Sequence, residues 1–162
     1  MQVSVVVPTY NRRQRLLLLL GNLNDSVHPV EEVIIVDAGN DMLLPADLSA
    51  FPNLAIVYLL SRPSVCVQRN TGIKAARYPW IFICDDDIEV PADYLAKLSA
   101  HIEKYPRAGA VTGMILQQAN GKWLDRYNIV SVKQLFARYI FGLGIWGNIT
   151  CNSNNYFVRK IK

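Results

Sequence analysis

Short apolar runs separated by helical patterns constrain the fold of this chain more than any other feature. Residues 3–7, 33–36 and 80–84 are almost wholly apolar and rich in valine and isoleucine. Runs of this length are typical of strands that are buried on both faces, as in a parallel sheet. Because such strands alternate with helical segments, the sequence predicts a three-layer α/β/α fold with a mostly parallel sheet.

The remaining elements follow from hydrophobic periodicity and from turn residues. In the first half of the chain we expect a helix with the buried stripe Leu16, Leu19, Leu20 and Leu23, a loop over residues 41–53 with Pro45 and Pro52, and a strand over 54–60. Two further helices are expected, one over 65–77 preceded by Ser64 and one over 91–105 with the stripe Leu95, Leu98 and Ile102. A strand over 108–117, a turn at Asn120 and Gly121, and a last strand over 155–158 should follow. Gly72 is expected to let its helix pack closely on the sheet.

Carboxylates follow two of the buried strands directly. The strand over residues 80–84 leads into Asp85, Asp86 and Asp87, and the strand over 33–36 leads into Asp37. If these strands are parallel, their carboxyl ends meet at one edge of the sheet, where open α/β sheets bind ligands. Three adjacent carboxylates repel one another, and a divalent cation with its preference for oxygen ligands would relieve that repulsion. A solvated acidic turn is the alternative.

The composition describes an ordinary globular protein. The chain has 162 residues, 51% hydrophobic and 19% charged, and a formal net charge of +4. Its lysines and arginines are mostly scattered, which argues against a nucleic-acid partner. Three widely spaced cysteines without a Cys-x-x-Cys pair, and a first strand with no leader pattern before it, favour a reduced, cytoplasmic setting. The longest apolar stretch, residues 135–149, contains Arg138 and three glycines.

Four motifs, in this order and spacing, resemble the family 2 glycosyltransferases, which are inverting enzymes of the GT-A fold, a Rossmann-like α/β/α architecture. The resemblance covers nearly the whole chain. The motifs are Ser4-Val5-Val6-Val7-Pro8-Thr9-Tyr10-Asn11-Arg12, Val36-Asp37-Ala38-Gly39-Asn40, Gln68-Arg69-Asn70-Thr71-Gly72-Ile73 and the Asp-x-Asp motif Asp85-Asp86-Asp87. The second departs from the family's usual Asp-Asp-Gly-Ser type sequence.

The resemblance implies a site for a nucleotide-diphosphate sugar, with a UDP-sugar as the favoured donor. Its residues would be Thr9, Tyr10, Asp37, Arg69, Asp85 and Asp86. Thr9 and Asp37 would lie at the base and Asp86 near the ribose. Asp87, helped by Asp85, would hold Mn²⁺ or Mg²⁺, which neutralises the departing diphosphate. From the residues alone, Arg69 could equally be a solvated helix residue.

Inversion requires a general base that deprotonates the acceptor hydroxyl. In the family this base is an acidic residue after a strand that resembles residues 152–159, so we expect it beyond Lys162. We therefore interpret residues 1–162 as a single GT-A domain, apparently truncated at its C-terminus. Residues 1–117 would be its nucleotide-sugar-binding half, and residues 118–162 an incomplete acceptor-side half.

Two other classes of function stay open at this level. One is a non-catalytic nucleotide-sugar-binding module, and the other is a Mg²⁺-dependent phosphoryl- or nucleotidyl-transfer protein of the α/β class. The sequence has no Gly-x-x-x-x-Gly-Lys-Ser/Thr loop and no Gly-x-Gly-x-x-Gly loop after the first strand. For the enzyme, the acceptor would be a saccharide or a lipid-linked saccharide of polysaccharide biosynthesis. The basic C-terminus and the aromatic stretch from Leu135 to Trp146 favour peripheral association at the inner face of the membrane. The oligomeric state is open.

Overall fold

The computed structural model describes residues 1–107, 109–111, 116–119, 122–125 and 156–159. The chain divides into two units: residues 1–112 together with 154–162, and residues 113–153. The elements of the first unit are β1 (Val3–Thr9), α1 (Arg13–Asn24), β2 (Glu32–Asp37), α2 (Pro45–Ser49), β3 (Ile56–Leu60), α3 (Val65–Ala75), β4 (Trp80–Ile83), α4 (Tyr94–Lys104), β5 (Ala110–Val111) and β8 (Tyr156–Arg159).

The first unit is built on a six-stranded sheet in the order β3-β2-β1-β4-β8-β5. Strands β3, β2, β1 and β4 are parallel, with Thr9 opposite Asp37 where β1 pairs with β2. Strand β8 is antiparallel to both of its neighbours, β4 and β5. The predicted mostly parallel sheet is therefore confirmed, and it has one antiparallel strand near its edge.

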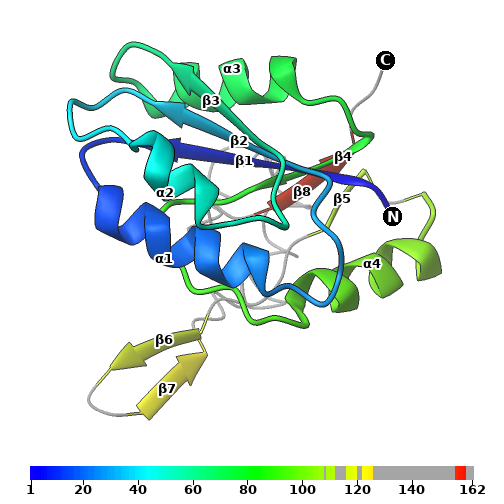
Figure 1. The fold of residues 1–162 in the computed structure, drawn as a ribbon. Coiled ribbons are helices and arrows are strands. Elements are labelled where there is room, and N and C mark those ends of the chain that lie inside the picture. Colours follow the sequence, from blue (N-terminus) through cyan, green and yellow to red (C-terminus); the bar gives the residue numbers. More distant parts are fainter. Residues whose placement is uncertain (108, 112–115, 120–121, 126–155, 160–162) are drawn as a thin grey trace, which may run out of the picture. The chain divides into compact units, whose positions relative to one another are not determined.

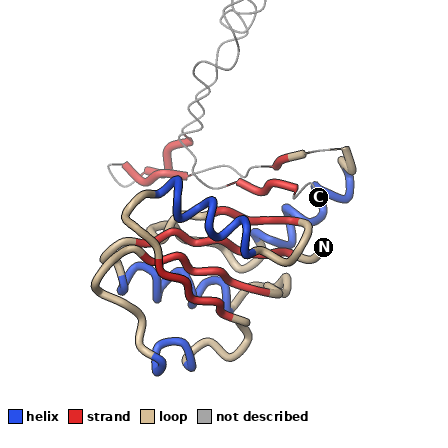
Figure 2. Tube along the Cα trace, turned by 90° about the horizontal axis from the view of Figure 1, so that it is seen from above, coloured by secondary structure: helices blue, strands red, loops and turns tan. Residues whose placement is uncertain are grey.

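Helices cover both faces of this sheet. Successive side chains of a strand point to opposite faces, and both sets are apolar here, so both faces must be covered. Figure 1 shows α1, α2 and α4 on one side of the strands and α3 on the other, and Figure 2 shows the strands from above, side by side. Val5 and Val7 of β1 belong to the core beneath α1 and α4, whereas Val6 belongs to the core with Ala76. Both predicted stripes are buried: Leu16, Leu19, Leu20 and Leu23 on α1, and Leu95, Leu98 and Ile102 on α4.

Gly72 brings α3 close to the centre of the sheet, as predicted. A Cβ atom at this position would lie 2.3 Å from Val6 Cγ1, well inside van der Waals contact. Helix α3 begins where expected, with Ser64 as its N-cap, and ends at Ala75 instead of Arg77.

Three local predictions were wrong. The expected loop over residues 41–53 contains the short helix α2, because Pro45 suits the first helical position and the Asp47 carboxylate accepts from Leu44 N at 2.7 Å. Helix α4 begins at Tyr94, three residues after Pro91. The single strand expected over 108–117 is two strands in different sheets, β5 and β6 (Leu116–Ala119).

The second unit contributes one described hairpin. Strand β6 pairs antiparallel with β7 (Lys122–Asp125), and Ala119 lies opposite Lys122. The turn predicted at Asn120 and Gly121 and the apolar stretch 135–149 lie outside the described residues. Within the described ranges, no helix is both long enough and apolar enough to cross a membrane.

Candidate functional site

The carboxyl ends of β1, β2 and β4 form the candidate site. The chain leaves β1 to build β2 and β3 on one side, then crosses to β4 on the other side, so the strand order reverses between β1 and β4. In open α/β sheets ligands bind at such a switch point, outside the carboxyl ends of the strands. Thr9 ends β1, Asp37 ends β2, and the acid triplet, Asp85 to Asp87, follows β4.

Two arginines, one from each of two distant segments, form ion pairs with the acid triplet. Arg12, in the loop after β1, donates from Nη1 to Asp86 Oδ1 at 3.2 Å and to Asp87 Oδ2 at 2.8 Å. Arg69, on α3, donates from Nη2 to Asp85 Oδ1 at 2.7 Å. The charges of Asp86 and Asp87 raise the pKa of Arg12. The repulsion expected among the three carboxylates is thus relieved by cationic side chains.

Asp86 is the buried member of the triplet, with 4% of its surface exposed. Its second oxygen accepts a hydrogen bond from Thr9 Oγ1 at 2.7 Å, so the last residue of β1 is joined directly to the loop after β4. Burial of a carboxylate is costly without partners, and Thr9 and Arg12 supply them. The structure therefore brings together Thr9 and Asp86, two of the residues assigned from the sequence.

Asp37 is fixed by two donors at the end of β2. The backbone N–H of Gly39, two residues further along the chain, donates to Asp37 Oδ1 at 2.7 Å, and the hydroxyl of Tyr58 in β3 donates to Oδ2. Partial burial of Tyr58 and its hydrogen bond to Asp37 raise the pKa of the Tyr58 hydroxyl. The phenol therefore stays a donor at neutral pH, and Asp37 is held in a defined orientation at 2% exposure.

Asn11 and Gln68 hold the loops of the site in place. Asn11 has a positive φ of 53°, and its Oδ1 accepts from Asn40 N at 2.7 Å and from Asp41 N at 3.3 Å. A Cβ on Gly39 would lie 2.4 Å from that oxygen, so glycine is required there. Gln68 Nε2 donates to the carbonyls of Thr9 and Val36, which ties α3 to the ends of β1 and β2.

Arg69 carries an unused donor inside the site. Its side chain is 18% exposed, and its Nε atom is buried without a hydrogen-bond partner among the described residues. Buried N–H groups almost always have an acceptor, from the protein, water or a ligand. An acceptor such as a phosphate or carbonyl oxygen would satisfy this atom.

Asp85 and Asp87 have the chemistry to hold a divalent cation together with a ligand. Both carboxylates are partly exposed, at 24% and 48% of their side chains. No group of three or more His, Cys, Asp or Glu residues within the described ranges is arranged to enclose a metal. Proteins usually hold Mg²⁺ with one or two carboxylates plus substrate phosphates.

Sequence reasoning identified the acids but missed several of their partners. Arg12 was part of a recognised motif without a role, and neither Gln68 nor Tyr58 had one. The available signal was that Arg12 lies in the loop after the first strand, three residues beyond Thr9; this signal does not show which carboxylate Arg12 meets. Tyr10, expected at the site, lies in the same loop with 52% exposure.

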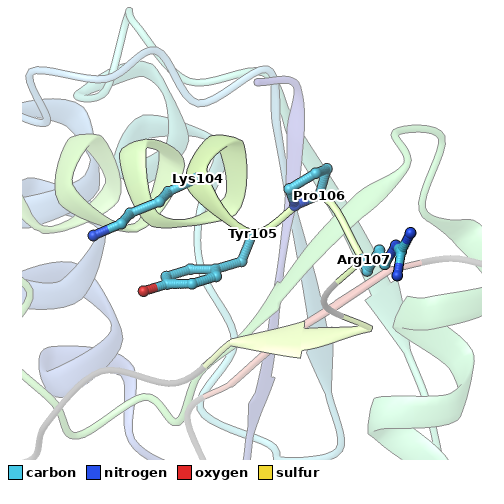
Figure 3. Close-up of a pocket in the computed structure, with 4 residues that line it drawn as sticks. All are labelled: Lys104, Tyr105, Pro106 and Arg107. Carbon is cyan, nitrogen blue, oxygen red and sulfur yellow. The ribbon is translucent and has the colours of Figure 1, made fainter.

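A separate surface hollow is lined by Lys104, Tyr105, Pro106 and Arg107 (Figure 3). It lies at the C-terminal end of α4, whereas the acid triplet precedes that helix. Lys104 Nζ lies 5.5 Å from the centre of the Tyr105 ring, and Figure 3 shows Arg107 on the other side of Pro106. These four consecutive residues present no carboxylate and contain none of the predicted site residues.

The sequence matches a known protein family over nearly its whole length. The model for glycosyl transferase family 2 matches residues 4–161. The chain belongs to this family. Among curated relatives, the uncharacterized glycosyltransferase YwdF of Bacillus subtilis (strain 168) is 31% identical over 104 residues, which are 64% of this chain and 39% of that protein.

Solved structures of glycosyltransferases share the fold. S. aureus TarS 1-349 in complex with UDP-GlcNAc has a TM-score of 0.64 at 22% identity, over 78% of this chain and 37% of that one. The mannosyltransferase PcManGT from Pyrobaculum calidifontis, in complex with GDP-Man and Mn²⁺, has a TM-score of 0.61 at 26% identity, over 72% of this chain and 36% of that one. The predicted GT-A fold of this family 2 chain is confirmed. The chain spans less than half the length of each of these three proteins.

Proposed function

We propose that this chain forms the donor site of a glycosyltransferase that transfers a sugar from a nucleotide-diphosphate sugar to an acceptor hydroxyl. The observation that carries the proposal is the convergence of the acid triplet, Arg12 and Arg69 at the switch point between β1 and β4. A diphosphate needs cationic groups and amide or guanidinium donors, and both arginines pair with members of the same acid triplet.

The residues of the chain divide the donor among them. Asp37, held by Tyr58 and Gly39, presents carboxylate oxygens that can accept from the N–H of a base, and Thr9 borders the same edge. Asp86 is held beside them and would accept from a ribose hydroxyl. Arg69, whose Nε atom lacks an acceptor, would donate to the nucleotide.

Asp85 and Asp87 would hold Mn²⁺ or Mg²⁺ against the phosphate oxygens. When bound, the cation supplies positive charge that stabilises the departing diphosphate. Mn²⁺ is present with GDP-Man in the structure of PcManGT, which supports this assignment. UDP-GlcNAc and UDP are the ligands in structures of TarS, so UDP and GDP are the nucleotides to compare.

The finer points of the reaction rest on the family. They are inversion at the anomeric carbon, a saccharide or lipid-linked acceptor, and peripheral association with the membrane. We assign no general base within residues 1–162, and the division into a donor half and an acceptor half at residue 117 stays a prediction.

Calorimetric titration with UDP and with GDP, each with and without Mn²⁺, tests the proposal. Asp87→Asn should weaken metal-dependent binding of the preferred nucleotide by about 2 kcal/mol, roughly thirtyfold, because it removes one charged contact. Asp93→Asn is the matched control, since Asp93 is similarly exposed (53%) and pairs with Lys97 instead. If the nucleotide affinity depends neither on Mn²⁺ nor on Asp87, the metal assignment is wrong. If the folded protein binds neither nucleotide, the donor site itself is wrong.

A further inference from the structure

Arg12 forms an ion pair with Asp87, one of the two carboxylates that would hold the proposed metal. Its Nη1 atom donates to Asp87 Oδ2 at 2.8 Å and also to Asp86 Oδ1 at 3.2 Å. A guanidinium and a divalent cation repel each other, and both seek the same carboxylate oxygens. Arg12 and a metal therefore compete for Asp87, unless Arg12 moves.

The two arginines of the site differ in their freedom to move. Arg69 is mostly enclosed, with 18% of its side chain exposed and Nε buried, whereas 53% of the Arg12 side chain is exposed. The Arg12 carbonyl accepts from Leu16 N at 3.0 Å, which anchors the backbone at the start of α1. A half-exposed arginine on a fixed backbone can change rotamer and return its head group to water at small cost.

Departure of Arg12 would leave no buried carboxylate without a partner. Asp86, the buried neighbour, keeps its hydrogen bond of 2.7 Å from Thr9 Oγ1. Asp87 is 48% exposed and would be neutralised by the arriving cation. The exchange at Asp87 thus costs the ion pair between Arg12 and Asp86, while Asp86 keeps Thr9 as its partner.

We infer that Arg12 is an internal counterion that a divalent cation displaces from Asp87 when the metal site fills. This inference rests on the proposed metal role of Asp87. It makes Arg12 a determinant of metal affinity: with Arg12 in place, metal alone binds more weakly than the carboxylates would otherwise allow. Removal of this positive side chain should therefore tighten the binding of a cation.

The test is a titration of free Mn²⁺ by electron paramagnetic resonance, on the 162-residue protein without nucleotide. Arg12→Gln should bind Mn²⁺ about three- to tenfold tighter than the wild type, since the ion pairs of a half-exposed arginine oppose the exchange only modestly. Arg12→Lys, which keeps the charge without the planar donor group, should fall between the two. It also serves as the second variant if Arg12→Gln fails to fold by circular dichroism.

Arg13→Gln is the matched control. It removes the same charge from the neighbouring position, but Arg13 pairs with Asp47, so its Mn²⁺ affinity should stay within about twofold of the wild type. If the wild type binds Mn²⁺ through Asp87 and Arg12→Gln binds equally or more weakly, the exchange is wrong while the metal site stands. If no variant binds Mn²⁺ in a manner that Asp87→Asn abolishes, with or without UDP, the proposed metal role fails and the exchange fails with it.

Discussion

At the scale of single residues, Tyr58 is the clearest test of how Asp37 works. Its hydroxyl donates to Asp37 Oδ2 from the neighbouring strand β3. Tyr58→Phe removes that donor, so the carboxylate loses its fixed orientation, and nucleotide affinity should fall by about 1 kcal/mol, roughly fivefold. Calorimetry with UDP or GDP measures this change.

The Tyr58 prediction has two internal controls. Mn²⁺ binding without nucleotide should be unaltered in Tyr58→Phe, because Asp85 and Asp87 follow a different strand. Tyr105→Phe, which removes an exposed tyrosine hydroxyl at the end of α4, should leave both affinities unchanged. Equal loss of metal and nucleotide binding in Tyr58→Phe would indicate general unfolding and would contradict a role through Asp37.

Individual site residues were predictable where a local pattern marked them. Asp37 and the acid triplet stand directly after apolar strands, and that pattern alone placed them at one edge of the sheet. The partners of these acids were not marked: Arg12 lies 75 positions from Asp87 in the chain, and an arginine in a loop is usually solvated. Which carboxylate it meets depends on the pairing of β1 with β4, which no local pattern contains.

At the scale of elements, the packing of α3 on β1 depends on Gly72. Gly72→Ala places a Cβ where Val6 Cγ1 would lie 2.3 Å away, so the helix must shift outward. We expect a loss of about 1–3 kcal/mol in the free energy of unfolding, as for other overpacked cores. Urea denaturation followed by circular dichroism measures it.

Gly21 of α1 supplies the contrast. A Cβ there would meet no atom within 4 Å, so Gly21→Ala should stabilise the helix by about 0.5–1 kcal/mol. Because α3 also carries Gln68 and Arg69, Gly72→Ala should weaken nucleotide binding, and Gly21→Ala should not. Similar effects of the two alanine substitutions on stability would contradict the close approach of α3 to the sheet.

A buried carboxylate joins three segments at the opposite end of the sheet. Glu32, 1% exposed, accepts from Ser4 Oγ at 2.6 Å, from Arg77 N at 2.7 Å and from Arg77 Nε at 2.9 Å. Burial alone would raise its pKa, but the hydrogen bonds from Ser4 and Arg77 outweigh burial and lower the pKa below its ordinary value of 4.5. Ionised Glu32 therefore stabilises the fold.

The sign of the pH dependence follows from this shift. Because the folded pKa lies below the unfolded one, the stabilisation is complete above about pH 4.5 and is lost as the pH falls through the folded pKa. Glu32→Gln should lower the free energy of unfolding by about 2 kcal/mol at neutral pH, and the difference from the wild type should shrink in acid. Urea denaturation at a series of pH values measures both, with the exposed Glu103→Gln as a control. A difference that is constant down to about pH 3 would contradict the assignment.

At the scale of the whole molecule, alternation of strands and helices was enough to predict the parallel sheet. The strand order was less accessible. Strand β8 inserts antiparallel between β4 and β5 although it lies far along the chain, and this pairing is a long-range choice. A single strand was predicted over residues 108–117, because nothing in the hydrophobicity of this segment shows that residues 110–111 and 116–119 join different sheets.

The central claim is that a nucleotide diphosphate and a divalent cation bind where the strand order reverses, between the carboxyl ends of β1 and β4. The most direct measurement is a crystal structure of the protein grown with UDP or GDP and Mn²⁺, with anomalous diffraction to locate the manganese. We predict an anomalous peak beside Asp87 and Asp85, the diphosphate against it, and the base near Asp37. A nucleotide bound elsewhere, such as at the hollow lined by Lys104 and Arg107, or manganese away from the acid triplet, would contradict the account.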